Sequence, residues 1–364
     1  MLYMGCIWAD REHNPLCAAI RAIARVPRAA RVVAVASREA SKAERFAARH
    51  GLLNSRRGAP ARVYASYASL LADERVEAVY IPLPTALHAE WVARAAAAGK
   101  HVLVEKPVAL NEAEMEAMAA ACAEAGVVLQ DGTMFTFDAR WERVDAEVAR
   151  IAPVRHVSAC FCFAGDTDFR AGNIRVDPSL DALGCLGDVG WYAVRAALRA
   201  YGWRAPMRLT AHGHARRNAA GVLVACGATL DFGGGQTACV ECAFDRALTQ
   251  RVEILGEDGA ISMEDAFVPH KPQSSSYSLV RRKQHAYHQL LRRASFDHST
   301  HTISSCGVPQ ESAMWASFAA ACTEPRGEVA VAAAARARLT QRVVCAIDES
   351  LRSSPPRTVD VRAL

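Results

Sequence analysis

Residues 101–107 read His-Val-Leu-Val-Glu-Lys-Pro, and they say more about the architecture of this chain than any other segment. A short apolar run that ends in this way is typical of a buried parallel strand. Doubly wound folds bind ligands at the carboxyl ends of such strands, where the ammonium group of Lys106 can hold a cofactor and polarise a reacting oxygen. Pro107 disfavours helix at Lys106 and turns the chain. A solvated lysine is the alternative, and the surroundings of this tripeptide favour a functional role.

Short apolar runs alternate with alanine-rich helical stretches throughout the first 135 residues. We expect strands at 31–36, 63–65, 78–81, 101–104 and 127–129, and helices at 41–50, 85–98 and 111–125. Asn111 is a good N-cap for the last of these helices, and a glycine follows each of them. Apolar strands separated by helices predict a parallel sheet covered on both faces, so residues 1–135 are expected to form a Rossmann-type domain.

The pattern changes near Pro153, and residues 136–364 are expected to form an α+β domain with a large, mainly antiparallel open sheet. Longer runs with polar interruptions predict strands at 154–163, 207–214, 222–232, 237–244 and 251–255, with a hairpin turn at 233–235. Helices are expected at 190–201, 310–322 and 331–351. Residues 270–305 are rich in Ser, His, Arg and Lys and are expected to be a variable exposed loop. An open sheet usually needs a partner, so we expect a homodimer through it.

Composition excludes several classes of protein. The chain has 364 residues and a formal net charge of +5 from dispersed arginines, which suggests two domains and no nucleic-acid partner. Its apolar runs are too short for a membrane span and its amino terminus lacks a signal-peptide pattern, so a cytoplasmic location is expected.

Twelve cysteines in such a chain are expected to be reduced and mostly buried. Cys239 and Cys242 have the spacing of half a zinc site, but a matching second pair is missing from the sequence. Packing of these thiols in the core is the better interpretation, and no metal is expected.

Ser37-Arg38 directly follows the predicted strand at 31–36. A dinucleotide-binding fold that prefers NAD normally carries an acidic residue here for the ribose hydroxyls, whereas an arginine suits a 2′-phosphate. NADP is therefore the expected cofactor. An ordinary surface arginine before a helix is the alternative.

Pro82-Leu83-Pro84-Thr85 forms a rigid loop at the end of another strand. This loop can lie along the cofactor through its backbone, and Thr85 is expected to cap the helix that follows. His88 falls in the first turn of that helix. A structural role is its more common interpretation, and a cofactor contact is the alternative.

Residues 181–192 contain three glycines at triplet spacing, which allow a close approach of the backbone. Asp188 and Tyr192 are four residues apart and share one face of a helix that begins here. A phenol ionises near about pH 10, and a neighbouring ammonium group such as that of Lys106 lowers its pKa. Lysine and tyrosine then form an acid–base pair that moves a proton while hydride goes to nicotinamide. A tyrosine that only packs its helix onto a sheet is the alternative.

These motifs together resemble the glucose–fructose oxidoreductase/inositol dehydrogenase (Gfo/Idh/MocA) family. Glu105-Lys106-Pro107 follows a Rossmann strand, and Asp-Val-Gly-Trp-Tyr at 188–192 opens a helix of a second domain. The runs 79–85, 132–134 and 173–175 are similar to the dimeric dihydrodiol dehydrogenase/D-xylose 1-dehydrogenase branch and its plant-type relatives.

The resemblance implies NADP, a lysine near the nicotinamide ribose and the substrate, and a catalytic tyrosine. Many relatives have histidine at the position of Tyr192, which favours the dihydrodiol/xylose branch over the inositol branch. Arg140 and Arg175 match arginines of similar relatives.

The first turn departs from the pattern of the family. Relatives open with a glycine-rich turn such as Gly-Cys-Ala-x-Ile-Ala, which lays the pyrophosphate on a helix N-terminus. Only Gly5-Cys6 remains of it here, and bulky Ile7 and Trp8 follow. An impaired cofactor loop is one interpretation, a rebuilt loop is another, and a true start elsewhere in the gene is a third.

The sequence thus predicts an NADP-dependent dehydrogenase that acts on a CH–OH group of a sugar such as xylose or of a trans-dihydrodiol, with neither a nucleic-acid nor a membrane partner. Two alternatives are a non-catalytic dinucleotide-binding sensor or scaffold and an NAD-dependent glycosidase. The expected catalytic residues are Lys106, Asp188 and Tyr192. The expected cofactor-binding residues are Gly5, Cys6, Ser37, Arg38, Pro82, Leu83, Pro84, Thr85, His88, Glu105, Lys106 and Pro107.

Overall fold

The computed structural model describes residues 1–7, 15–26, 28–54, 59–271, 274–282, 296–304 and 308–362. The chain divides into two compact units. Unit 1 comprises Met1–Met134, Ser179–Asp181 and Val308–Gln341, and unit 2 comprises Phe135–Pro178, Ala182–Gly307 and Arg342–Leu364. The first segment of unit 1 ends at Met134, one residue before the expected domain boundary at residue 135. The sequence pattern did not predict that Val308–Gln341 also belongs to unit 1.

Unit 1 contains a six-stranded parallel sheet in the order β3-β2-β1-β4-β5-β6. Its strands are β1 (Leu2–Ile7), β2 (Ala30–Ala36), β3 (Arg62–Tyr64), β4 (Ala78–Ile81), β5 (His101–Val104) and β6 (Leu129–Asp131). Strand β4 is buried at every residue and β5 at all but its first. The prediction of a Rossmann-type parallel sheet is confirmed, because strands of this kind need cover on both faces.

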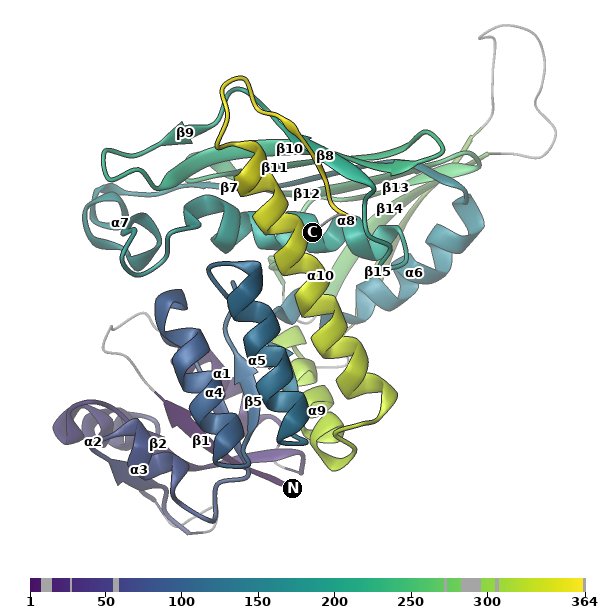
Figure 1. Cartoon of the computed structure of the whole chain (residues 1–364). Coiled ribbons are helices and arrows are strands. Elements are labelled where there is room, and N and C mark those ends of the chain that lie inside the picture. The colour runs from purple at the N-terminus through teal and green to yellow at the C-terminus, as the bar shows by residue number, and fades with distance from the viewer. Residues whose placement is uncertain are drawn as a thin grey trace, which may run out of the picture. The chain divides into compact units, whose positions relative to one another are not determined.

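The three helices that the sequence predicts in unit 1 are present, and each ends one residue before its expected end. They are α2 (Ala40–Arg49), α4 (His88–Ala97) and α5 (Glu112–Glu124). The unit also contains α1 (Pro15–Ala24), which the sequence pattern did not predict, and α3 (Tyr67–Leu71). The Asn111 side chain accepts a hydrogen bond of 2.9 Å from the Glu114 N–H and so caps α5. Gly99 and Gly126 follow α4 and α5 with φ of +69° and +67°, the left-handed conformation that stops a helix. Helices α4 and α5 lie side by side (Figure 1).

The carboxyl-terminal helix α9 (Gln310–Thr323) and the first part of α10 (Glu328–Ser350) also belong to unit 1. The Ser312 hydroxyl donates a hydrogen bond of 3.1 Å to the Ala22 carbonyl oxygen of α1. The Trp315 ring packs edge-on against Tyr80 of β4, with 5.3 Å between ring centroids. These long-range contacts explain why a segment so late in the chain completes the first unit.

Unit 2 is built on a ten-stranded sheet in the order β15-β14-β13-β12-β7-β11-β10-β8-β16, with β9 paired to β10. Its strands are β7 (Val154–Ala164), β8 (Arg208–Ala211), β9 (Arg216–Arg217), β10 (Leu223–Gly233), β11 (Gln236–Ala243), β12 (Asp245–Gly256), β13 (Gly259–Met263), β14 (Ser274–Arg282), β15 (Phe296–Ser304) and β16 (Thr358–Asp360). Among the described strands of this ten-stranded sheet, only β7 and β11 pair in parallel, which confirms the mainly antiparallel sheet. Gly233-Gly234-Gly235 make the expected β10–β11 hairpin with positive φ at each residue.

Two helices of unit 2 lie against this sheet (Figure 1). Helix α8 (Trp191–Ala200) packs on β7 and β11, and α6 (Ala139–Ile151) packs on β12 to β14. Nearly every residue of α8 is buried, so this helix forms the centre of the core of unit 2.

The expectation of an exposed loop at 270–305 was wrong for the described part of that segment. Residues 274–282 and 296–304 form β14 and β15, which pair with each other, and β14 also pairs with β13. The Ser-Ser-Ser-Tyr-Ser-Leu run buries alternate residues, including Tyr277 and Leu279. Ser274, Ser276 and Ser278 occupy the outward positions of this amphipathic strand, a period of two that composition alone conceals. Residues 272–273, 283–295 and 305 lie outside the described part.

Within the described ranges, every helix is too short or too polar to cross a membrane.

Candidate functional site

The loop after β5 carries Glu105, Lys106 and Pro107 at the carboxyl edge of the parallel sheet. The Glu105 carboxylate accepts a hydrogen bond of 2.5 Å from the Tyr80 hydroxyl and one of 3.3 Å from the Lys106 N–H. A Cβ on Gly132 would lie 2.8 Å from Glu105 Oε1, so glycine leaves room for that carboxylate. Glu105 therefore anchors the backbone of Lys106, and the anchoring residues Tyr80 and Gly132 are ones that the sequence did not single out for this role.

The loop Pro82-Leu83-Pro84 follows β4 at the same edge of the sheet. The prediction that Thr85 caps α4 was wrong. Thr85 begins a 3₁₀ turn, η2 (Thr85–Leu87), which precedes α4, and the N-cap of α4 is Leu87. The N-cap of η2 is Pro84, which makes no side-chain hydrogen bond there. Thr85 is buried in that turn.

His88 joins the loops that follow β4 and β5. Its ring Nε2 lies 2.9 Å from the Leu83 carbonyl oxygen, and Nδ1 lies 3.1 Å from the carbonyl oxygens of both Pro107 and Val108. The side chain is buried, and burial lowers its pKa against the opposing effect of these hydrogen bonds. Because both ring nitrogens face backbone oxygens, we assign His88 to positioning the two loops, and its direct contact with a cofactor stays a prediction.

Ser37 and Arg38 directly follow β2, which lies beside β1 in the sheet. Ser37 is buried, and its N–H donates a hydrogen bond of 3.2 Å to the Tyr64 carbonyl oxygen of β3. Arg38 is exposed and hydrogen-bonds to Tyr67; burial raises the pKa of that phenol, and the guanidinium lowers it. The end of β2 thus presents a cation and no carboxylate at residues 37–38.

Gly5 and Cys6 lie inside β1, and the expectation that they open a glycine-rich turn was wrong. A Cβ on Gly5 would lie 2.5 Å from Leu70 Cδ2, so this glycine serves the packing of α3 on the sheet. The Cys6 thiol is fully buried, which raises its pKa to about 12. The turn that contains Trp8 lies outside the described residues.

In unit 2, Asp188 lies in a π-helical turn, η5 (Leu186–Gly190), that runs directly into α8. The Asp188 carboxylate is almost buried and accepts a 2.7 Å ion-pair contact at Oδ1 from Nε of Arg175. Arg175 belongs to a 3₁₀ turn, η4 (Ile174–Val176), which Asn173 caps by accepting from the Arg175 N–H. The sequence matched Arg175 to similar relatives without giving it a role, and the structure gives it Asp188 as a partner.

Tyr192 lies in the first turn of α8, and its ring is surrounded by phenylalanines. Its centroid lies 5.7 Å from that of Phe135, 5.5 Å from that of Phe161 and 5.7 Å from that of Phe267. Phe161 and Phe267 stack on each other with an interplanar angle of 18°. The ring position is therefore fixed by packing.

The glycines of 181–192 approach the sheet of unit 2 closely. Gly184 has φ +55°, and a Cβ there would overlap the Leu223 carbonyl oxygen. A Cβ on Gly190 would lie 2.9 Å from Cys242 Sγ. These two positions fit η5 against β10 and β11.

Arg140 is fully buried and serves the structure of unit 2. Its guanidinium donates to Asp265 Oδ1 at 2.7 Å and to the carbonyl oxygens of Ser276 at 3.0 Å and Ala266 at 3.2 Å. These bonds hold the amino-terminal end of α6 against the outer strands of the sheet.

Comparisons with known proteins agree with this architecture. Residues 13–133 match the oxidoreductase family with an NAD-binding Rossmann fold, and residues 141–262 match the GFO/IDH/MocA C-terminal domain. The chain is 38% identical to D-xylose 1-dehydrogenase (NADP(+)) 2 of Haloferax volcanii over 235 residues, which are 64% of this chain and 68% of that protein.

Two more relatives differ in their substrates. Trans-1,2-dihydrobenzene-1,2-diol dehydrogenase of Sus scrofa is 30% identical over 239 residues, 64% of this chain and 66% of that protein. The crystal structure of a 3-ketoreductase from Actinomadura kijaniata in complex with NADP and TDP-benzene has a TM-score of 0.77 at 26% identity, over 95% of this chain and 97% of that one. With both of its domain models matched and a relative of this identity, the chain belongs to the Gfo/Idh/MocA oxidoreductase family.

Proposed function

We propose that the protein is an NADP-dependent oxidoreductase that transfers hydride between a carbinol carbon of a sugar or trans-dihydrodiol and nicotinamide. The observation that carries this proposal is the anchored Glu105-Lys106 loop at the carboxyl end of β5 in a Rossmann-type sheet. Relatives named as NADP enzymes and as sugar or dihydrodiol dehydrogenases support the substrate class.

The end of β2 fits NADP better than NAD. A ribose 2′-phosphate requires a cation at this position, and Arg38 is an exposed guanidinium there, while the Ser37 N–H and side chain fix the turn that presents it. The loops Pro82–Thr85 and Glu105–Pro107 would hold the rest of the cofactor. Bound NADP supplies the acceptor or donor of hydride at its nicotinamide ring.

Tyr192 is the proposed acid–base residue that takes the proton of the substrate hydroxyl during oxidation and returns it during reduction. Its ring is fixed by Phe135, Phe161 and Phe267. Asp188, held by Arg175, positions the substrate hydroxyls by accepting hydrogen bonds from them. Lys106 holds the reacting oxygen and stabilises negative charge on it.

Kinetics of the Tyr192→Phe variant test this proposal. The variant keeps the ring and its packing, so NADPH binding should be unchanged while turnover of D-xylose or a trans-dihydrodiol falls by about 10²- to 10⁴-fold. Tyr201→Phe is the matched control, since the Tyr201 hydroxyl only donates to the Thr237 carbonyl oxygen at 2.7 Å at the other end of α8. Near-normal turnover by Tyr192→Phe would remove this residue from the mechanism, and failure of the wild-type protein to oxidise any sugar or diol with NADP⁺ would overturn the proposed function.

A homodimer through the open face of the unit 2 sheet is part of the proposal. Leu255 of β12 is exposed on the face opposite the buried residues Gln250, Val252 and Ile254, which supports burial of this face in an assembly. Light scattering at micromolar concentration should give twice the mass of the chain. A monomer under those conditions would contradict the dimer without affecting the proposed chemistry.

A further inference from the structure

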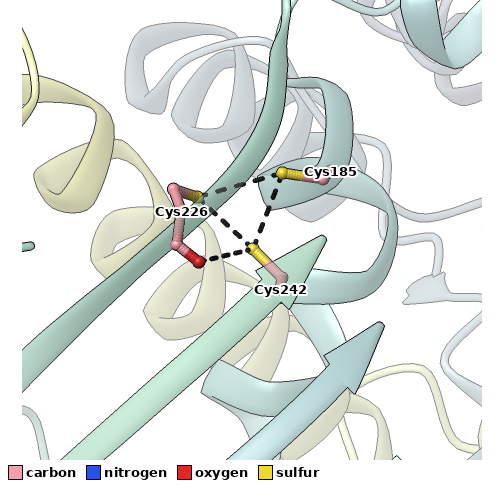
Figure 2. A group of neighbouring side chains, drawn as sticks. All are labelled: Cys185, Cys226 and Cys242. Atoms are coloured by element: carbon pink, nitrogen blue, oxygen red, sulfur yellow. Dashed lines mark hydrogen bonds between the residues drawn. The ribbon is translucent and has the colours of Figure 1, made fainter. Parts of the chain in front are cut away.

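Three cysteines from separate segments of unit 2 meet in its core (Figure 2). Cys185 directly precedes η5, Cys226 lies on β10 and Cys242 lies on β11. Each side chain is buried, and Cys226 and Cys242 are direct partners in the antiparallel register of the two strands.

The sulfur atoms form a compact triangle. The Sγ–Sγ distances are 3.3 Å for Cys226–Cys242, 3.8 Å for Cys242–Cys185 and 4.0 Å for Cys185–Cys226. A point equidistant from all three sulfurs lies about 2.2 Å from each of them, close to the length of about 2.3 Å of a metal–thiolate bond. Apolar side chains pack with their heavy atoms about 4 Å apart. The Cys226–Cys242 distance of 3.3 Å between sulfur atoms is shorter than this packing distance.

We propose that Cys185, Cys226 and Cys242 bind one Cu(I) ion through their three sulfur atoms. Soft thiolate ligands select Cu(I) and Zn²⁺ among the common biological metals. A structural Zn²⁺ site is almost always four-coordinate, whereas Cu(I) accepts three sulfurs. The space beside Cys226 and Cys242 has no room for a water molecule that could serve as a fourth ligand. Glu241 also lines this space, but its carboxylate already contacts His212 and Arg246.

The ion would connect the segment that carries the proposed acid–base residue to the sheet. Cys185 lies three residues before Asp188 and seven before Tyr192. The single S–H of Cys242 is within reach of two acceptors, Cys185 Sγ at 3.8 Å and the Cys226 carbonyl oxygen at 3.5 Å, and can donate to one of them at a time. Binding of Cu(I) replaces these weak hydrogen bonds by coordinate bonds and releases thiol protons.

Two other side-chain clusters of unit 2 could bind added Cu(I), and the experiment must distinguish them from this site. Cys160 and Cys162 have sulfur atoms 3.5 Å apart, which makes them a two-thiol competitor. His212, His214 and Glu241 form a more exposed group, in which Glu241 already has an ion pair of 3.1 Å with Arg246.

The test is an anaerobic titration of the full-length reduced protein with Cu(I) in competition with bathocuproine disulfonate. The wild-type protein should retain one equivalent of Cu(I) in the presence of the chelator. The Cys226→Ala variant should lose this equivalent. The matched controls, Cys160→Ala/Cys162→Ala and His212→Ala, should keep that equivalent. NADPH binding and circular dichroism report whether each variant is folded.

X-ray absorption of the copper-loaded wild-type protein tests the site independently of any variant. It should show three sulfur ligands at about 2.2–2.3 Å. The proposal would be overturned by two sulfurs or by nitrogen ligands, by retention of the equivalent in folded Cys226→Ala, by a four-coordinate Zn²⁺ held in place of Cu(I), or by a Cys226–Cys242 disulfide in the protein as isolated.

Discussion

The ion pair between Arg175 and Asp188 should contribute measurably to the stability of unit 2. Its Nε–Oδ1 distance is 2.7 Å, and the exposed fractions of the two side chains are 29% and 9%. Loss of one partner of a fully buried pair costs about 3–5 kcal/mol, and an exposed pair contributes about 0.2–1 kcal/mol. Because the arginine is partly exposed, we expect Asp188→Asn to lower the free energy of unfolding by about 1–3 kcal/mol, or the melting temperature by roughly 2–4 °C per kcal/mol.

A double-mutant cycle with Arg175→Met and Asp188→Asn isolates the interaction, with unfolding in urea as the assay. The coupling energy should be about 1–2 kcal/mol. Arg94 and Glu90 on α4 form the matched control, since their contact of 2.9 Å joins side chains that are 54% and 48% exposed. Their coupling should stay below about 0.5 kcal/mol. A coupling at Arg175–Asp188 no larger than the control would refute the reasoning that burial makes this pair strong.

Two further predictions concern stability. Gly190→Ala should lower the free energy of unfolding in urea by about 1–3 kcal/mol, because the added Cβ would lie 2.9 Å from Cys242 Sγ. Gly172→Ala is the control, since there is open space around that site, and it should change the free energy of unfolding by less than about 0.5 kcal/mol. Equal losses of stability in the two variants would count against tight packing at Gly190. Hydrogen bonds from Arg75 hold the pKa of Asp73 well below its ordinary value, so the carboxylate stabilises unit 1 above the unfolded-state pKa of about 4 and loses this effect as the pH falls toward the folded-state value. The stability difference between wild type and Asp73→Asn should therefore shrink between about pH 6 and pH 2, and a difference that is constant with pH would contradict that assignment.

Much of unit 1 could be predicted because its strands are buried on both faces. The bounds of β4 and β5 agree with the expected strands at 78–81 and 101–104. A short, continuous apolar run between turn-forming residues is stable in such a fold as a strand that is buried on both faces. Asn111 caps α5 as expected because its short side chain reaches the N–H of the residue three positions later.

Contacts between side chains of distant segments could not be predicted from the sequence pattern. The contact of Arg175 with Asp188 and the convergence of Cys185, Cys226 and Cys242 depend on how η4, η5 and the strands are packed, not on spacing along the chain. Gly5 was misassigned for a related reason, since the same glycine suits a phosphate loop and a strand that must admit Leu70.

A fluorescence titration with NADPH and NADH measures the cofactor preference of the protein directly. It compares the purified wild-type protein with the Arg38→Ala variant and with the exposed α2 control Arg45→Ala. We predict that NADPH binds at least about tenfold more tightly than NADH, a difference of about 1.4 kcal/mol. This preference should be lost in Arg38→Ala and kept in Arg45→Ala. Equal affinity of the wild-type protein for both cofactors, or tighter binding of NADH, would contradict the assignment of the protein as an NADP-dependent oxidoreductase.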